Sequence, residues 1–176
     1  MERFGMLELL DQITMANDHG LHYLALMATL AVPDMCAALA SQSGESTGGL
    51  YKQWVDSNMT DSSRQGLSSH GIYRLRCSIL HQGSGFHDGD ELERVMFAEP
   101  GGPVKISASK AIHIGEEQMS THIIDLLEFC QAVNDAARRW LKSNVVVSPV
   151  KENLERIIRR HPNGIPPFIV GIPTIG

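Results

Sequence analysis

The residues best suited to chemistry lie in one short stretch, residues 71–83, which holds two arginines and a histidine close to the expected end of a helix. The arginines, Arg74 and Arg76, carry planar guanidinium groups that donate paired hydrogen bonds to phosphate and stay charged. The histidine, His81, can give and take a proton near neutral pH. A cation that stabilises charge on a phosphate, together with a proton donor or acceptor, is the minimum needed to cleave RNA without a metal.

The spacing alone does not decide which arginine acts with His81. At about 100° per residue, Arg74 lies within about 20° of His81 on a helix. Cys77 and Ser78 are expected on that same face. Arg76 is about 140° away from His81, so it needs a long side-chain reach, a distorted last turn or a second subunit to meet the same phosphate. Both arginines stay candidates, and Arg74, Cys77 and Ser78 are candidate substrate contacts.

Charge is distributed unevenly along the chain, and the stretch with the arginines lies in a block without acids. The net charge is −5, which at first sight disfavours a polyanion as partner. By segment, the charge is −6 for residues 1–61, +3 for residues 62–87, −7 for residues 88–137 and +5 for residues 138–176. Two explanations fit the lack of acids in residues 62–87 equally well: this block binds an anionic ligand, or it is a polar face in contact with solvent.

Helical periodicity covers most of the first half of the chain. An apolar face predicts a first helix that ends near residues 17–20, and a run that is apolar nearly all round follows it up to Pro33. Because proline breaks a helix interior, we expect a break or kink near residues 32–34. Two further helices are predicted over residues 50–59 and 67–82, the second ended by a glycine.

The pattern changes after residue 88. Short β-prone segments around a Pro-Gly-Gly-Pro turn predict a small antiparallel hairpin or meander inserted at about residues 93–114. The longest predicted helix follows over residues 116–143, and a Ser-Pro pair then starts a last helix that ends at Pro162. The apolar, proline-interrupted tail of residues 165–176 cannot continue a helix, so we expect it to dock in extended form on its own domain or on a partner, or to stay loose.

Length indicates one domain, over residues 1–164, and the helical periodicity makes it mainly α-helical with about five to six helices. The chain has 176 residues, of which 43% are hydrophobic and 20% charged, so it can bury a core. Cys36, Cys77 and Cys130 lie far apart and fit neither a disulfide framework nor a metal-binding knuckle, so we expect a reducing cytoplasm and no metal or cofactor. Charge and proline interrupt the apolar run of residues 21–40, which predicts buried helices and no membrane span.

Residues 75–83 (LRCSILHQG) resemble the motif of the HEPN superfamily (higher eukaryotes and prokaryotes nucleotide-binding), in which an arginine and a histidine near a helix end have four to six residues between them. Arg76 and His81 match this motif with four intervening residues, and Arg74 and His81 match it with six. The downstream order of a β segment and a long helix is also similar, so the resemblance spans about residues 4–142. It implies a helical bundle that forms a homodimer, and many members are metal-independent ribonucleases whose active site is composed from both subunits.

The resemblance implies that Arg76 stabilises the scissile phosphate, that His81 donates or accepts the proton, and that Arg74 is a secondary phosphate ligand. The expected substrate is single-stranded or exposed RNA rather than DNA, cut by transesterification at a dimer cleft. Cys77 stands where the family usually has Asn, Asp or His. The alternative is therefore a catalytically inactive HEPN-like module that binds a nucleotide or a protein partner such as an antitoxin. A third interpretation is a structural oligomer that uses the tail as its interface.

Overall fold

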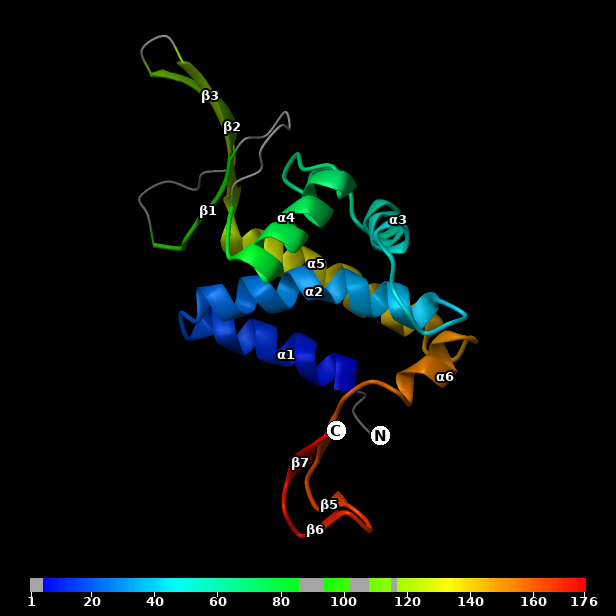
Figure 1. The fold of residues 1–176 in the computed structure, drawn as a ribbon. Coiled ribbons are helices and arrows are strands. Elements are labelled where there is room, and N and C mark those ends of the chain that lie inside the picture. The colour runs from blue at the N-terminus through cyan, green and yellow to red at the C-terminus, as the bar shows by residue number, and fades with distance from the viewer. Residues whose placement is uncertain (1–4, 86–93, 102–107, 115–116) are drawn as a thin grey trace.

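The computed structural model describes residues 5–85, 94–101, 108–114 and 117–176. This part of the chain is mainly helical with a few small strands, as predicted (Figure 1). The helices are α1 (Gly5–Asp18), α2 (His22–Ala40), α3 (Gly48–Asn58), α4 (Ser69–Gln82), α5 (Leu126–Asn144) and α6 (Val150–Leu154). The strands are β1 (Arg94–Ala98), β2 (Ala108–Ile114), β3 (Glu117–Asp125), β4 (Arg160–His161), β5 (Gly164–Ile165), β6 (Ile169–Val170) and β7 (Thr174–Ile175).

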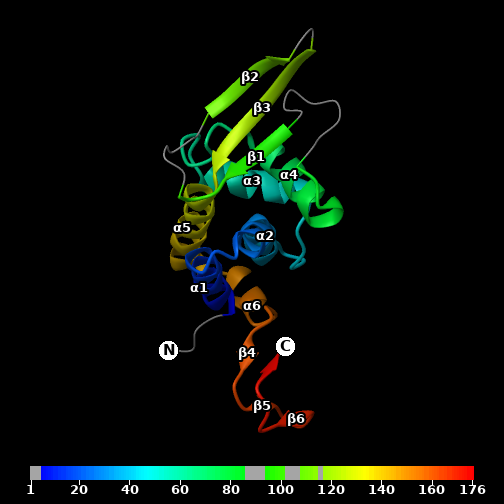
Figure 2. The ribbon, with the colours of Figure 1, turned by 90° about the vertical axis from the view of Figure 1, so that its left-hand side faces the viewer.

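Helix α2 is the centre of the bundle. It contacts α1, α3, α4, α5 and α6, and Figures 1 and 2 show it lying among them. A helix that is apolar nearly all round is typical of such a position. Within the described ranges, α2 is the one helix long and apolar enough to cross a membrane, but half of its apolar stretch is buried against the rest of the protein. That burial is also what the core helix of a globular bundle shows.

A break or kink was predicted near residues 32–34, and the break is wrong, because α2 is one helix through Pro33. Proline cannot donate the usual hydrogen bond to the carbonyl four residues earlier, which belongs to Thr29. Both Pro33 and Thr29 are buried within the bundle. We attribute the continuity of α2 to packing on several sides, since tertiary packing supplies most of the stability of helices in proteins.

A three-stranded sheet lies above α3, α4 and α5 in Figure 2. Its order is β1-β3-β2, and the central strand β3 pairs antiparallel with β2 and parallel with β1. A hairpin is therefore present, but β2 and β3 form it, and β1 does not pair with the next strand along the chain. Residues 104–107, which were predicted to form the second arm of the hairpin, lie outside the described residues.

The predicted helix over residues 116–143 is wrong in its first turns, because β3 continues to Asp125 and α5 begins only at Leu126. Branched residues such as Ile123 and Ile124 suit a strand, and β3 is paired on both sides. The Asp125 side chain then caps α5 by accepting a hydrogen bond from the Glu128 N–H at 2.9 Å. This Asp-x-x-Glu pattern is a helix-start signal that the periodicity alone did not reveal.

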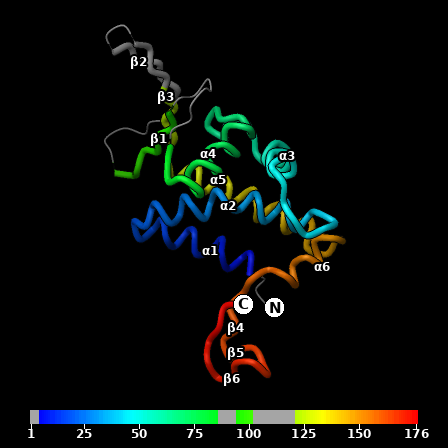
Figure 3. Tube along the Cα trace, viewed as in Figure 1, coloured from blue at the N-terminus to red at the C-terminus, as the bar shows by residue number. Residues whose placement is uncertain are grey.

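The C-terminal part of the chain folds back on itself. Helix α6 ends at Leu154, well before the helix end predicted at Pro162. Strand β4 pairs with β7 and β5 pairs with β6, while Arg159 and Gly176 exchange two backbone hydrogen bonds of 3.0 and 3.1 Å. The tail forms short strands and turns and does not continue a helix, as predicted. It leaves the bundle beside the start of α1 instead of covering the helices (Figure 3).

Candidate functional site

Helix α4 carries all the predicted site residues, and local signals fix both of its ends. Ser68 caps the first turn, since its hydroxyl accepts a hydrogen bond from the Gly71 N–H at 3.0 Å. At the other end Gly83 has a φ of 65°, a left-handed conformation that suits glycine, and its N–H donates to the Ile79 carbonyl at 3.1 Å. The helix predicted over residues 67–82 is confirmed. The Gly83 cap ends it one residue after His81, so His81 lies in the last turn.

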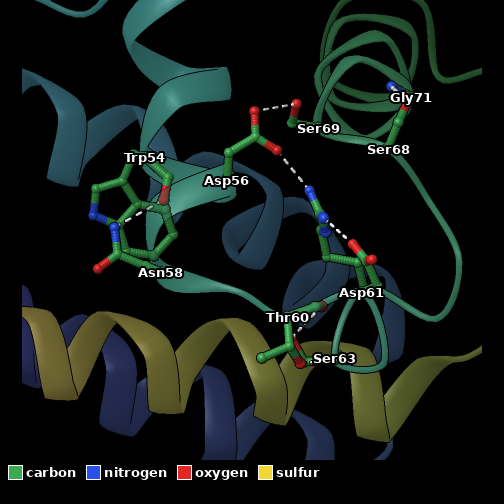
Figure 4. A network of polar contacts seen from close by, with 10 residues as sticks. Trp54, Asp56, Asn58, Thr60, Asp61, Ser63, Ser68, Ser69 and Gly71 are labelled. Atoms are coloured by element: carbon green, nitrogen blue, oxygen red, sulfur yellow. Dashed lines mark hydrogen bonds and ion pairs between the residues drawn. The ribbon is translucent and has the colours of Figure 1, made fainter.

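A polar network ties the start of α4 to the end of α3 (Figure 4). Arg64, in the turn between the helices, pairs with Asp56 at 2.6 Å and also with Asp61. The other carboxylate oxygen of Asp56 accepts a hydrogen bond from Ser69 Oγ at 2.8 Å. The Asp56 carboxylate therefore connects α3, the turn and α4. This network fixes the start of α4, the helix that carries Arg76 and His81.

The structure brings Arg76 and His81 together. Arg76 Nη1 lies 3.0 Å from His81 Nε2, so the long arginine side chain spans the separation around the helix that the spacing predicts. A guanidinium group can only donate hydrogen bonds, so His81 Nε2 accepts with its lone pair and the imidazole proton is on Nδ1. His81 is exposed and Arg76 is half-buried, so the pair lies at the protein surface.

A third residue, Asp34 of α2, holds the arginine in place. Arg76 Nε donates to Asp34 Oδ2 at 2.7 Å, and Ser46 Oγ donates to Asp34 Oδ1 at 3.0 Å. Both carboxylate oxygens of Asp34 thus accept a hydrogen bond, which holds the carboxylate in place. The guanidinium group is oriented by its Nε on Asp34, and its Nη1 faces His81. Sequence reasoning missed Asp34, which is 42 residues before Arg76. The one available signal was an acid inside an otherwise apolar helix.

The surroundings of Arg76 keep it charged. Burial lowers the pKa of Arg76, but the carboxylate of Asp34 and the hydrogen bonds to Cys77 and Asp34 act the other way, and the net effect is a raised pKa. The side chains of Arg76 and Asp34 are only 22% and 21% exposed, so solvent screens their attraction incompletely. The site therefore holds a permanent, oriented cation next to an imidazole lone pair.

Cys77 connects the Arg76 site to a pair of tyrosines. Its Sγ lies 3.9 Å from Arg76 Nη1, and its hydrogen bond with Tyr73 raises the pKa of that phenol. The rings of Tyr73 and Tyr51 pack with their centroids 5.3 Å apart, and the Tyr51 hydroxyl donates to the Leu30 carbonyl at 3.1 Å. Cys77 is thus a half-buried thiol between Arg76 and an aromatic layer.

The remaining predicted contacts lie in different surroundings. Ser78 is 4% exposed and belongs to the core side of α4, so it does not share an open face with Cys77. Arg74 is half-buried on α4, and its part in binding stays a prediction. A cation that the sequence analysis did not select, Lys52, has Nζ 5.9 Å from the centroid of the Tyr73 ring.

The three cysteines are free thiols, as the absence of a disulfide framework in the sequence predicts. Burial raises the pKa of Cys36 and Cys130, which both lie in the core. Cys77 is half-buried and is the thiol at the site.

The arrangement combines a fixed guanidinium, an exposed imidazole and a carboxylate that orients the guanidinium. Such a group can bind an oxyanion and move a proton at one of its oxygens. Comparison with other proteins adds no identification, since no protein-family model, no curated protein and no solved structure matches this chain.

Proposed function

We propose that this protein is a HEPN-like, metal-independent endoribonuclease that cuts single-stranded or exposed RNA in the cytoplasm. The observation that carries the proposal is the 3.0 Å contact between Arg76 Nη1 and His81 Nε2, made by an arginine that Asp34 holds from the other side at 2.7 Å. A fixed cation and an imidazole at one exposed place are the two groups that phosphate cleavage without a metal requires.

In the proposed reaction the scissile phosphate enters between the two side chains and replaces their mutual hydrogen bond. The ribose 2′-oxygen attacks phosphorus while its proton passes to His81 Nε2, the nitrogen that carries the lone pair. The bond from phosphorus to the 5′-oxygen breaks, which leaves a 2′,3′-cyclic phosphate on one fragment and a 5′-hydroxyl on the other. The Arg76 guanidinium stabilises the extra negative charge on the phosphate oxygens, and Arg74 is a secondary phosphate ligand.

The 5′-oxygen must also gain a proton when it leaves. One copy of the chain contributes one His81, which accepts a proton in the first half of the step. A homodimer that places the protonated imidazole of a second copy's His81 at the same phosphate supplies the donor, which is why we include a dimer cleft in the proposal. Asp34 and Ser46 are positioning residues in this scheme, since they reach the phosphate only through Arg76.

The test is cleavage of a labelled single-stranded RNA by the purified protein in excess chelator. We expect cleavage to yield cyclic phosphate ends and His81→Ala to lower the rate by about 10²–10⁴-fold with an unchanged helical circular-dichroism spectrum. Arg139→Ala, which changes an exposed arginine of α5, is the matched control and should leave the rate unchanged. RNA that stays intact at several pH values, or a rate that His81→Ala does not lower, would contradict the proposal.

A second candidate is an inactive module with the same site. It is favoured by one specific feature, since the Arg76 guanidinium already contacts Asp34, His81 and the Cys77 thiol in the same chain. Such a module would hold a nucleotide phosphate or an acidic segment of a partner such as an antitoxin. Tight binding of a nucleotide or a short RNA without turnover, lost in Arg76→Ala, would select this candidate over the ribonuclease.

A further inference from the structure

An aromatic ring and a second cation lie beside the Arg76–His81 site. Tyr73 comes three residues before Arg76 on α4, so the two side chains lie on the same side of the helix, within one turn of each other. Lys52 is on α3, which packs beside α4 (Figure 1), and its Nζ is 5.9 Å from the centroid of the Tyr73 ring. The groups therefore follow one another from the end of α4 toward α3 in the order His81, Arg76, Tyr73 and Lys52.

Three contacts fix the orientation of the Tyr73 ring. The ring packs against Tyr51, which is fully buried, with the ring centroids 5.3 Å apart and the ring planes at 60°. Its hydroxyl end lies against Gly48, where a Cβ would come within 2.7 Å of the Tyr73 oxygen, so this close approach requires a glycine. The hydroxyl is also hydrogen-bonded to Cys77. A ring that is held in this way loses little freedom when a ligand binds to it.

Lys52 occupies the face of the Tyr73 ring that a planar ligand could use. Both residues are only partly buried, and a lysine side chain is flexible, so the ammonium group can move aside. Lys52 makes no ion pair with any residue that the structure describes. Asp56, one turn further along α3, is engaged by Arg64 and Ser69 instead. The charge of Lys52 therefore remains available to an anion once a ligand covers the ring.

Aromatic rings interleaved with cations are a pattern that proteins use to bind single-stranded nucleic acids. Each base has an aromatic face that stacks on such a ring, and the phosphates pair with the cations. In a duplex the bases are already stacked on one another, so only an unpaired base reaches a ring on the protein. Here Tyr73 is the ring, with Arg76 on one side of it and Lys52 on the other. This order fits an RNA strand that runs from His81 toward α3.

We propose that the base of a nucleotide beside the scissile phosphate stacks on Tyr73, and that Lys52 then pairs with a further phosphate of the same strand. This inference rests on the proposed function, since it extends the site for RNA, and it narrows the substrate to an unpaired strand. Stacking accepts any base, so the contact selects single-stranded RNA and not a particular sequence. Tyr73 and Lys52 bind the substrate in this scheme, and neither moves a proton.

The experiment measures the binding of a labelled, single-stranded 2′-O-methyl RNA to the full chain by fluorescence anisotropy in excess chelator. This RNA has no free 2′-hydroxyl, so the proposed reaction cannot cut it. We expect Tyr73→Leu, which keeps an apolar side chain against Tyr51 but removes the flat ring, to raise the dissociation constant by about 10- to 100-fold. Tyr73→Phe keeps the ring and should bind like the unchanged chain. Phe168→Leu, at an aromatic residue of the tail that is 85% exposed, is the matched control and should also bind normally. Circular dichroism checks that each variant is folded.

The cation is tested through the salt dependence of the same binding. Lys52→Ala should raise the dissociation constant about fourfold at about 0.15 M salt, and it should lower the slope of its logarithm against the logarithm of salt concentration by about 0.7, which corresponds to one lost phosphate contact on a single strand. Lys151→Ala, at an exposed lysine of α6, is the matched control and should change neither quantity.

Any one of three results would overturn the inference: equal binding by Tyr73→Leu and the unchanged chain, an unchanged salt slope for Lys52→Ala, or no binding of the single strand at all. Binding and cleavage are measured separately, so the two proposals fail separately. A chain that cuts RNA while its Tyr73→Leu variant binds normally contradicts this inference alone. A chain that binds RNA through Tyr73 without cutting it contradicts the ribonuclease alone.

Discussion

The end of α4 and the C-terminal tail arrange polar and apolar groups in opposite ways. At the end of α4, the charged groups of Asp34 and Arg76 meet at a half-buried place and are hydrogen-bonded within the chain. In the tail, side chains such as Phe168 and Ile172 are exposed, and backbone hydrogen bonds hold the segment together. At the end of α4 the ion pair offsets the hydration that its charges lose, whereas the exposed apolar side chains of the tail have no such compensation. In the proposed function, an anion binds at the end of α4.

The largest expected difference between the two regions is in stability. Leu75 is fully buried on the core side of α4, so Leu75→Ala should lower the free energy of unfolding by about 2–5 kcal/mol, through lost apolar burial and the cavity left behind. Denaturant unfolding followed by circular dichroism measures this. The matched control is Leu24→Ala, at a leucine that is 61% exposed, and it should change the free energy by no more than about 0.5 kcal/mol. Equal losses in both variants would show that α4 is not anchored by its core side.

The carboxylate at the site should matter more for cleavage than for stability. Asp34→Asn keeps a hydrogen-bonding oxygen for Ser46 but removes the charge that holds Arg76, so the proposed RNA cleavage should fall about a hundredfold through misplacement of the guanidinium. Stability should fall by only about 1 kcal/mol, because both side chains are partly exposed. Cleavage and unfolding are measured on the same preparation. Asp135→Asn, at an exposed acid of α5, is the control, and an unchanged cleavage rate for Asp34→Asn would remove this residue from the site.

A smaller effect is expected from the cap of α4. Ser68→Ala deletes the acceptor for the Gly71 N–H and should cost about 1 kcal/mol in the free energy of unfolding. The cleavage rate per folded molecule should stay the same, since the cap is at the far end of α4 from His81. Ser62→Ala, at an exposed serine of the turn between α3 and α4, controls for the loss of a hydroxyl. A loss of cleavage without a loss of stability would mean that the start of α4 takes part in the site.

The smallest effect on stability is expected in the tail. Ile172 is 63% exposed, so Ile172→Ala should change the free energy of unfolding of a single copy by no more than about 0.5 kcal/mol. The measurement is denaturant unfolding at a concentration below the dimer dissociation constant. A loss of more than about 1 kcal/mol there would show that the tail packs on its own bundle.

Much of the helical fold and part of the site were predictable from the sequence. The helices α1, α3 and α4 were found because their apolar period and end signals, such as Ser68 and Gly83, act over a few residues. Arg76 and His81 were named together through the resemblance of residues 75–83 to a known motif, since spacing alone left Arg74 and Arg76 both open. The structure shows Arg76 and His81 in contact, and their role stays a prediction. Asp34 was not found, because a contact between two helices depends on how they pack and leaves no mark in local spacing.

Local features of this protein follow from the order of its amino acids: which segments can be helical, where capped helices stop, and which stretch carries a cation and an imidazole. Other features depend on partners that are distant in the chain and come together only in the folded molecule. β3 is a strand because β1 and β2 pair with it, although its last residues fit a helical period. The helix through Pro33 persists because it is packed on several sides. In each case, contacts between distant segments outweigh a local preference worth only a few kcal/mol.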